Sequence, residues 1–447
     1  MFITEPEKKI AVTEEADLCV IGGSCTGVFA AVRAARLGLK VVLLEKNNVL
    51  GGTAVTGLVN IWHSLHDTDG REQVIAGLTH ETVERLKKRN AVNVSDDPSS
   101  AYSFNPFELA FILDEYVREN KIRIMLHTAY TAVVKDGRSV DAVIIENIEG
   151  RFAIKAKFFI DASGDGRVAK DLGITSYTNK TIQSPTACFY IQGDTNGLDI
   201  GTLVREHCKE FGLEDDWGWS KHLYGSKDIA MRADTHVFGL RLDCADDLTL
   251  AETEGRRMAD AFASLIRKYS GRDETYPIVG LCSHIGTRET LHYQTRFKAD
   301  ERSLLLGKRY DAPVMNGTYR VDIHHSEDMG ITFRYLDGRE DTFYGRNTRK
   351  ISGNWREREN ISGEPAKYYQ IPFEILVVDG YDNFIPVGRM INADEGSFGA
   401  LRVMVNLNQL GESAGVAAYL CVNEGKSVAD IEYKKVTKLL REGGSAL

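Results

Sequence analysis

The chain has 447 residues, of which 43% are hydrophobic and 27% charged, so it is large enough to bury the cores of two or three structural units. The net charge of -9 and the pI near 5.8 argue against nucleic acid as a partner, because phosphate-backbone binding needs clustered Lys and Arg. The first residues carry no apolar segment behind a basic start, and no apolar run reaches the roughly 20 residues of a membrane span, so we expect a cytoplasmic protein without a membrane segment.

Residues 16–46 read as a strand, a tight turn, a helix and a second strand. Residues 17–21 are short and apolar, residues 26–37 have helical composition before Gly38, and residues 40–44 are apolar again. Between the first strand and the helix, Gly22, Ser24 and Gly27 occupy the three fixed positions of a GxGxxG fingerprint. The segment therefore predicts a βαβ unit that binds a dinucleotide.

Each residue of this fingerprint has its own physical task. Gly22 allows the backbone conformation of the turn, and Gly27 lets the helix pack closely on the sheet. Ser24 is small enough for the backbone to approach a pyrophosphate, which the positive end of the helix attracts by about 0.3–2 kcal/mol. Glu45 ends the second strand, where a carboxylate accepts hydrogen bonds from ribose hydroxyls. The alternative is a bare βαβ unit with a surface glutamate.

The next hundred residues predict helices followed by a hairpin-rich sheet. Residues 73–89 are amphipathic, and Asn105 before Pro106 is typical of a helix start. Residues 121–134 and 140–148 are strand-like, and an apolar strand at 158–160 runs into a glycine-containing turn.

From about residue 181 the character changes to a second unit of strands and helices. Residues 186–193 and 235–243 are strand-like, and residues 248–270 predict a long helix with a capping box at Thr249 and Glu252. Residues 345–364 predict a surface excursion. Residues 409–422 then predict a helix in which Gly411, Ala414 and Gly415 permit close packing on the sheet.

Three blocks, at residues 16–57, 156–173 and 381–418, together resemble flavoproteins built like glutathione reductase. In this order they are similar to the FAD-dependent oxidoreductase family related to the fumarate reductase and succinate dehydrogenase flavoproteins. The resemblance implies that the strand at 158–160 lies beside the first strand, that Gly51 and Gly52 let the backbone pass under FAD, and that residues 399–404 lie at the isoalloxazine edge. It also implies a backbone contact to the adenine near Tyr130.

The fingerprint and the resemblance together assign FAD as the cofactor. The expected FAD-binding residues are Gly22, Ser24, Cys25, Thr26, Gly27, Glu45, Lys46, Gly51, Gly52, Thr53, Tyr130, Ala162, Ser163, Gly164, Asp165, Gly388, Arg389, Gly399, Leu401, Arg402, Val403 and Met404.

The expected fold class is α/β, with two domains. A Rossmann-like FAD-binding domain, a parallel sheet with an added antiparallel layer, is expected from residues 1–180 and 366–447. Residues 181–365 are expected to form an inserted α+β domain that roofs the flavin and holds the substrate.

Polar residues that could carry a proton or anchor a substrate fall in four places: His63 and His66; Cys282, His284, Arg288 and Glu289; Asp322, His324 and His325; and Glu395. We expect Arg288 to orient an acidic or electron-rich substrate group, and His63 or Glu395 to move the proton. Related sequences often carry histidine at the position of Glu395. The histidines have structural alternatives, and Arg288 can instead pair with Glu289 or with a distant carboxylate.

No metal site is expected. Adjacent histidines on a strand point to opposite faces, which disfavours a site at 322–325. The seven cysteines contain no CxxC pair, so they predict buried thiols rather than a disulfide framework or a metal cluster, and Cys25 is expected to fill space.

The expected activity is hydride transfer between the flavin and a small organic substrate. One alternative is a flavin monooxygenase, because residues 163–166 resemble a segment of the aromatic hydroxylases, and another is a protein that holds FAD or an adenylated product without turnover. Pyridine-nucleotide disulfide reductases carry two cysteines after the GGT motif, and here those positions are Ala54 and Val59. No second GxGxxG is found, so the sequence names no electron donor or acceptor. It also leaves open whether FAD is covalently attached and whether the protein forms a homo-oligomer.

Overall fold

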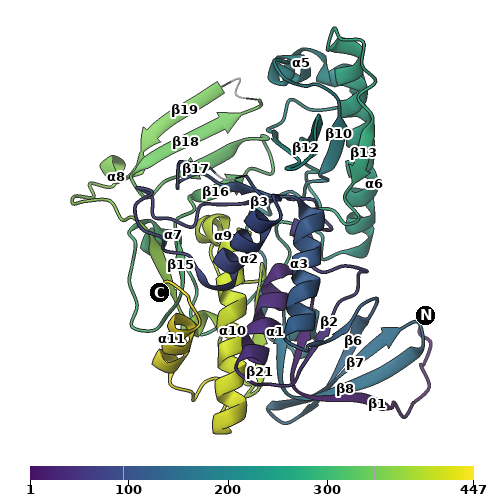
Figure 1. The fold of residues 1–447 in the computed structure, drawn as a ribbon, viewed down its shortest axis with the longest axis vertical. Helices are drawn as coiled ribbons and strands as arrows, with labels where there is room; N and C mark the ends of the chain where they lie inside the picture. The colour runs from purple at the N-terminus through teal and green to yellow at the C-terminus, as the bar shows by residue number, and fades with distance from the viewer. Residues whose placement is uncertain (94, 347–348) are drawn as a thin grey trace.

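The computed structural model describes residues 1–93, 95–346 and 349–447, and a seven-stranded sheet forms the base of this part of the chain (Figure 1). The strand order is β5-β2-β1-β8-β7-β6, and β21 also pairs with β8. The strands are β1 (Val12–Ile21), β2 (Val41–Leu44), β5 (Arg123–Met125), β6 (Ala129–Asp136), β7 (Ser139–Asn147), β8 (Gly150–Asp161) and β21 (Phe384–Pro386).

Strand β8 organises this sheet because its two halves have different partners. Residues 150–155 pair antiparallel with β7, residues 159–161 pair parallel with β21, and β1 runs parallel along the other edge. Strand β1 pairs parallel with β2, and β2 with β5. The strand at 158–160 thus returns beside the first strand, as expected, and the hairpin β6–β7 adds an antiparallel layer to the same sheet. The α/β fold class is confirmed.

Two helices, α1 (Cys25–Arg36) and α10 (Met404–Glu424), pack against each other beside these strands (Figure 1). A Cβ on Gly411 would lie 2.2 Å from the carbonyl oxygen of Thr26, and one on Gly415 would lie 2.3 Å from that of Ala30. Only glycine permits this approach of two backbones. The small residues of α10 were expected to face the sheet, and these two glycines instead contact α1.

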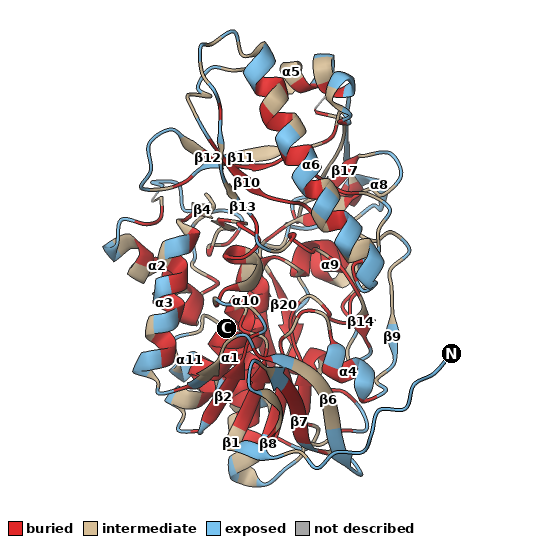
Figure 2. Ribbon diagram, turned by 90° about the vertical axis from the view of Figure 1, so that its right-hand side faces the viewer, coloured by how far each residue is buried: buried red, intermediate tan, exposed pale blue. Residues whose placement is uncertain are grey.

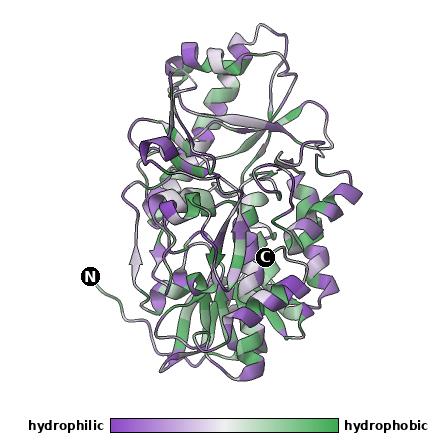
Figure 3. Cartoon of the chain, turned by 90° about the vertical axis from the view of Figure 1, so that its left-hand side faces the viewer, coloured by the Kyte–Doolittle hydropathy of each residue, from purple (hydrophilic) through white to green (hydrophobic). Residues whose placement is uncertain are grey.

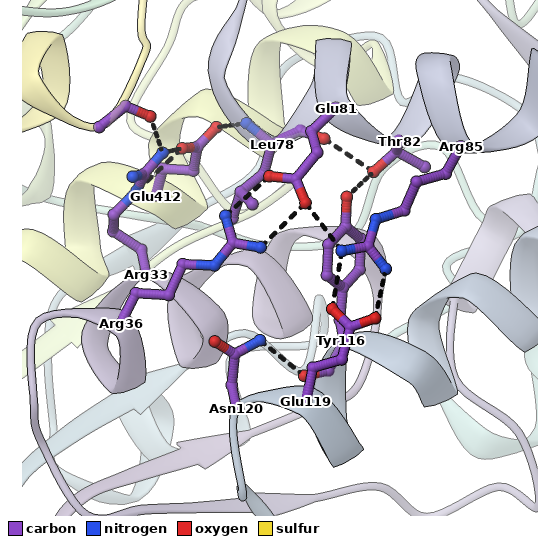
Figure 4. Close-up of polar contacts among 11 residues, drawn as sticks. Arg33, Arg36, Leu78, Glu81, Thr82, Arg85, Tyr116, Glu119, Asn120 and Glu412 are labelled. Atoms are coloured by element: carbon purple, nitrogen blue, oxygen red, sulfur yellow. Dashed lines mark hydrogen bonds and ion pairs between the residues drawn. The ribbon is translucent and has the colours of Figure 1, made fainter.

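A buried ion pair joins α1 and α10 to α2 (Gly77–Lys88) and to the end of α11 (Tyr433–Glu442), and α3 (Pro106–Glu119) packs against α2 (Figure 4). The guanidinium of Arg33 pairs with Glu412 and donates to the carbonyl oxygen of Gly443 at 2.9 Å, while Glu412 also accepts from the N–H of Leu78 at 2.9 Å. The side chains of Arg33 and Glu412 are 6% and 1% exposed. One carboxylate therefore ties three helices and the carboxyl-terminal segment together.

A second sheet, in the order β11-β12-β10-β13, lies beside the amphipathic helix α6, whose buried and exposed residues alternate along its length (Figure 2). Its elements are β10 (Phe189–Gln192), α5 (Ile200–His207), β11 (Trp219–His222), β12 (Ile229–Ala233), α6 (Ala245–Tyr269) and β13 (Ile278–Leu281). Residues 235–243 were expected to form a strand, and they run as irregular chain with one bridge from His236 to Thr186.

The expected capping box of α6 is wrong. The helix begins at Ala245, four residues before Thr249, whose hydroxyl donates to the carbonyl oxygen of Ala245 at 2.8 Å. Glu252 instead accepts from the N–H of Ile285 at 2.7 Å. Asp246 and Asp247 in the first turn favour the earlier start, because negative charge stabilises the amino end of a helix.

The remaining elements include a third, antiparallel sheet in the order β16-β17-β18-β19, whose edge strand β19 falls in the expected surface excursion at 345–364. The strands not yet described, in this sheet and in separate two-stranded pairs, are β3 (Ile61–Trp62), β4 (Tyr102–Ser103), β9 (Ser176–Tyr177), β14 (His292–Tyr293), β15 (Pro313–Gly317), β16 (Val321–His324), β17 (Ile331–Arg334), β18 (Arg339–Tyr344), β19 (Arg349–Asn354) and β20 (Tyr369–Pro372). The short helices are η1 (Gly52–Ala54), α4 (Arg167–Asp171), η2 (Cys208–Phe211), α7 (Glu301–Leu305), α8 (Trp355–Arg358), η3 (Phe373–Leu376) and α9 (Glu395–Leu401).

Apolar residues gather in the strands of the base sheet and in the helices packed on it, while the outer helices alternate in polarity (Figure 3). The largest buried cluster contains Val20, Phe29 and Leu410, and it also contains Met315 and Trp355 from the segment expected to be inserted. A second cluster, with Phe189 and other residues of β10, β12 and α6, fills the space beneath α6. Within the described residues, no helix is long and apolar enough to cross a membrane.

Candidate functional site

The turn between β1 and α1 forms one end of the site. Gly22 has φ +105°, and a Cβ there would lie 2.5 Å from the carbonyl oxygen of Ala162. A Cβ on Gly27 would lie 1.9 Å from the carbonyl oxygen of Gly22. Both glycines are therefore required by backbone contacts, as the fingerprint predicts.

Ser24 is the N-cap of α1. Its hydroxyl accepts from the N–H of Gly27 at 3.4 Å, which satisfies one of the free N–H groups at the start of the helix. The neighbouring Cys25 is buried against the carbonyl oxygen of Gly51, and burial raises its pKa to about 12. The serine thus replaces the central glycine of the fingerprint with a helix cap, and the cysteine fills space.

Glu45 at the end of β2 is buried and turned toward the glycine loop. Its Oε2 accepts from the N–H of Gly23 at 2.7 Å, and its Oε1 accepts from the backbone N–H and the side-chain amide of Asn47, both at 2.8 Å. Oε2 has a second lone pair, so the group can still accept from a ligand hydroxyl. The carboxylate is held in place on the cavity wall.

Asp165 links two cations at the same wall. Its Oδ1 accepts from Arg389 Nη2 at 2.6 Å, and its Oδ2 accepts from Lys46 Nζ at 3.2 Å. Burial opposes ionisation of Asp165, but Arg389 and Lys46 lower its pKa overall. The two cations are held beside the amino end of α1, where a pyrophosphate would be attracted.

One cavity of about 430 Å³ connects this end with a group of polar residues from the middle of the chain. The predicted site residues that line it are Gly22, Ser24, Cys25, Thr26, Glu45, Lys46, Gly51, Gly52, Thr53, His63, Ala162, Ser163, Gly164, Asp165, Arg288, Gly388, Arg389, Arg402, Val403 and Met404. His284, Asp322 and His324, which the sequence named as candidates, line it as well.

Other predicted residues are not part of this lining, among the described residues: Gly27, Tyr130, Glu395, Gly399 and Leu401. Leu401 is fully buried, and Gly399 lets α9 lie against β16, because a Cβ there would be 2.6 Å from the carbonyl oxygen of Asp322. The hydroxyl of Tyr130 donates to Asp171 at 2.8 Å. Glu395 begins α9 and is partly exposed, so its predicted role in proton transfer gains no support from the cavity.

The far end of the cavity meets the amino end of α10. The N-cap residue Val403 makes no side-chain cap, and Arg402, Met404 and Asn408 line the cavity. Asn408 is completely buried, and neither polar atom of its side chain hydrogen bonds to a described residue. An unpaired buried amide is costly, so a bound polar group is expected to complete it. This end, the glycine cradle and Glu45 together fit a dinucleotide cofactor.

His63, Tyr319 and Asp322 form a compact group above this end. The rings of His63 and Tyr319 lie with centroids 3.9 Å apart at an angle of 32°, and the hydroxyl of Tyr319 donates to Asp322 Oδ2 at 2.6 Å. Burial and the nearby charge of Arg320 lower the pKa of His63 to about 3, so this ring is neutral at pH 7. Burial opposes ionisation of Asp322, but Arg402 and Arg320 lower its pKa overall.

The neighbours of Asp322 have incomplete hydrogen bonding. Arg402 Nη2 lies 3.2 Å from Asp322 Oδ2, within ion-pair distance, but the angle is not that of a hydrogen bond, and Nη2 bonds to none of the described residues. His324 Nε2 lies 3.4 Å from Asp322 Oδ1. Burial and the charge of Arg288 lower the pKa of His324 well below its ordinary value. His325, next in the chain, bonds to Asp328 instead at 2.7 Å.

Arg288 is held from two sides. Its Nη1 donates to the carbonyl oxygen of Ser184 and to the hydroxyl of Thr186, both at 2.5 Å, and its Nη2 lies 3.1 Å from His236 Nε2. The alternative pairing of Arg288 with Glu289 is wrong, because Glu289 is buried in a separate contact with His292 at 2.9 Å.

Sequence reasoning missed an aromatic side of the cavity. Trp217, Trp219 and Phe333 line it, and the rings of Trp217 and Phe333 lie 6.1 Å apart at 78°. The guanidinium of Arg320 stands 4.0 Å from the ring centre of Phe333. No local motif marks these residues, because their strands and loops meet only in the folded chain.

Residues 17–440 match the family model described as FAD dependent oxidoreductase. The mitochondrial dihydrolipoyl dehydrogenase of Schizosaccharomyces pombe is 29% identical over 349 residues, which cover 71% of this chain and 61% of that protein; the mitochondrial dihydrolipoyl dehydrogenase of Caenorhabditis elegans is 48% identical over 61 residues, 12% of each chain. The chain thus spans less than two thirds of the length of these relatives.

Among solved structures, a geranylgeranyl bacteriochlorophyll reductase-like protein from Thermoplasma acidophilum is 11% identical with a TM-score of 0.49, and it is matched over 96% of this chain and 83% of that one. The p-nitrophenol 4-monooxygenase from Pseudomonas putida is 12% identical with a TM-score of 0.46, over 96% and 89% of the two chains. Because the family model covers nearly all of the sequence, the chain belongs to the FAD-dependent oxidoreductase family, and its cofactor is FAD.

Proposed function

We propose that the chain transfers a hydride between FAD and a small organic substrate that is held in the cavity. The observation that carries this proposal is the continuity of that cavity, which is lined by Gly22 and Glu45 at one end and by His63 and Arg288 at the other. Residues 181–365 are proposed to roof the flavin. In support, many of the lining residues that do not belong to the cofactor cradle fall between residues 186 and 333.

The cofactor-binding roles follow from the charges and the helix ends. The amino end of α1, with Lys46 and Arg389 beside it, would hold the pyrophosphate, and Glu45 would accept from the ribose. The amino end of α10, with Arg402 and Asn408, would hold the flavin ring. Bound FAD supplies the centre that takes or gives the hydride, so the chain has to bind, orient and move protons.

The substrate proposal rests on charge and shape. Four cations and one carboxylate line the part of the cavity beyond the cradle: Lys221, Arg288, Arg320, Arg402 and Asp322. The excess of positive charge favours a substrate with an acidic group, and the aromatic side favours a planar, apolar body. In this proposal Arg288 anchors the acidic group.

His63 is the proposed carrier of the proton that accompanies hydride transfer. Its pKa of about 3 keeps it neutral at pH 7. An anionic substrate group beside the ring would raise that pKa, because a nearby negative charge favours the imidazolium. The proton would then be held only while substrate is bound. Glu395 is left out of the proposal, because it does not line the cavity among the described residues.

The reaction named for the dihydrolipoyl dehydrogenases is not proposed for this chain. The two positions that carry cysteine in the disulfide reductases are Ala54, which is fully buried, and Val59. Neither side chain can form or break a disulfide.

The test is anaerobic reduction of the FAD-loaded protein by a series of small organic acids and by their neutral amides, followed by the flavin absorbance. We expect one of the organic acids to reduce the flavin, which lowers the flavin absorbance, or an unsaturated acid to reoxidise the reduced flavin. Arg288→Met should abolish the response, while Arg358→Met, at an exposed arginine that pairs with Glu340, should not. Consumption of oxygen together with NAD(P)H would instead support a monooxygenase. A flavin that no donor reduces would contradict an enzymatic function.

A further inference from the structure

Three side chains are linked in series by polar contacts, from Asp216 in the protein interior through His236 to Arg288. Asp216 Oδ2 lies 2.6 Å from His236 Nδ1, and His236 Nε2 lies 3.1 Å from Arg288 Nη2. Asp216 is 4% and His236 1% exposed. Neither residue lines the cavity among the described residues, whereas Arg288 does.

The chemistry of the three groups fixes the proton positions. A guanidinium can only donate, so His236 Nε2 must accept from Arg288. The proton of the neutral imidazole is then on Nδ1, where it donates to the carboxylate of Asp216. The ring of His236 thus links the carboxyl group of Asp216 to the guanidinium of Arg288.

The other contacts of Arg288 leave part of its fork free. Nη1 donates to the carbonyl oxygen of Ser184 and to the hydroxyl of Thr186, and one N–H of Nη2 points to His236. The remaining N–H of Nη2 and the N–H of Nε take part in no hydrogen bond with the described residues. A guanidinium fixed on one side and free on the other suits a planar acceptor such as a carboxylate.

We propose that Asp216 and His236 are positioning residues, which hold Arg288 protonated and turned into the cavity so that it binds the anionic group of the substrate. This inference rests on the proposed function of Arg288 as the substrate anchor. It adds two residues that neither touch the cavity nor belong to any motif of the sequence.

The charges around Arg288 set the direction of the expected pH effect. The groups that face it are His236 and Asp216, Arg402 and Asp322, His324, and Cys188. Burial and the charge of Arg402 lower the pKa of Arg288 to about 10, whereas Asp322, Cys188 and Asp216 act in the opposite direction. Arg288 therefore loses its proton, and with it the anion, as the pH rises through its pKa. Loss of the charge of Asp216 should move this alkaline limit to lower pH.

The experiment measures binding of benzoate to the FAD-loaded protein from pH 7 to pH 11, by the change in flavin absorbance, with neutral benzamide as the matched ligand. His236→Leu removes the acceptor, and benzoate affinity at pH 7 should fall about 10- to 100-fold, as expected for the loss of a hydrogen bond to a charged group. His236→Gln can accept from Arg288 and donate to Asp216, so it should bind benzoate within a few-fold of the wild type.

Asp216→Asn keeps an acceptor for His236 and loses only the charge. It should bind benzoate well at pH 7 but lose it at a lower pH than the wild type. The matched control is Asp328→Asn, at the Asp–His contact between Asp328 and His325, which does not reach Arg288. If His236→Leu does not take up FAD, the Gln and Asn variants still decide the question.

The outcomes separate the two proposals. If the wild type binds benzoate and benzamide equally, or does not bind benzoate, Arg288 is not an anion anchor, and both proposals about it are overturned. If the wild type prefers benzoate but Asp216→Asn keeps the wild-type alkaline limit, or His236→Gln binds as weakly as His236→Leu, the positioning role is overturned and the anchor stands.

Discussion

The two ends of the cavity are built in different ways. At the cofactor end, Gly22, Gly27 and Glu45 come from one stretch of about 25 residues, and their tasks are set by backbone contacts. At the opposite end, His63, Arg288 and Asp322 come from three segments that are far apart in the sequence. Their protonation and hydrogen bonding depend on charged groups and aromatic rings from other segments. The first end is a rigid cradle; the second is an electrostatic environment.

This difference predicts which changes abolish binding and which only retune it. A substitution at Gly22 or Gly27 has to move backbone, because the atoms nearest to the added Cβ belong to main-chain carbonyl groups. A substitution at the opposite end changes a charge or a hydrogen bond, and Asp322, on β16, can lose its charge while β16 stays paired with β17. The predictions below test that contrast, from the largest effect to the smallest.

Gly27→Ala should abolish FAD retention. Its Cβ would lie 1.9 Å from the carbonyl oxygen of Gly22, so α1 must shift away from the turn that precedes it. The measurement is the ratio of FAD to protein after gel filtration. Gly353→Ala, where a Cβ meets nothing within 4 Å, should keep a normal ratio. Full FAD content in Gly27→Ala would show that the turn is not a rigid cradle.

Glu412→Gln should lower the free energy of unfolding by about 3–5 kcal/mol, because it leaves the buried guanidinium of Arg33 without a compensating charge. The same change at Glu81, whose pair with Arg36 is about one third exposed, should cost about 0–1 kcal/mol (Figure 4). Urea unfolding of both variants at one FAD concentration gives the comparison. Equal costs would mean that the helices behind the cradle do not depend on the buried pair.

Glu45→Ala should weaken FAD binding by about 10- to 100-fold, through the loss of hydrogen bonds to a charged group. The carboxylate also holds Gly23 and Asn47, so part of the loss reflects a looser turn. Glu45→Gln, which keeps one oxygen acceptor, should lose less. Titration of the apoproteins with FAD measures both, and an unchanged affinity of a folded Glu45→Ala protein would place Glu45 outside the site.

The cradle could be predicted from the sequence because its information is local. The spacing of Gly22, Ser24 and Gly27 between two apolar strands is sufficient to predict a turn and a helix, whereas the place of β8 beside β1 was implied by the family resemblance. Only the role of Ser24 as the helix cap was missed, since the helix starts one residue earlier than its composition suggests.

The opposite end could be predicted only in part, because its residues meet through long-range packing. Arg288 and His63 were named, but Asp216 and Trp217 lie in an irregular loop that no periodicity marks. The alternating pattern at 235–243 predicted a strand, yet His236 is used for hydrogen bonding to Asp216 and Arg288 rather than for a regular ladder. Tertiary contacts overrode the local pattern there.

The last prediction concerns His63 and has the smallest effect. In the unfolded chain a histidine takes up a proton near pH 6.5, whereas burial and Arg320 keep the folded ring neutral down to about pH 3. Between these values the unfolded state binds more protons, so the folded protein loses stability as the pH falls, by at most about 1.4 kcal/mol per pH unit for this group. His63→Gln removes that term, so its apoprotein should lose about 1 kcal/mol less than the wild type between pH 7.5 and pH 5.5. Urea unfolding at the two pH values measures this difference, with His222→Gln at an exposed histidine as the control. If the two variants respond to pH alike, His63 is not held neutral by its surroundings, and the proposal that substrate charge controls its proton loses its basis.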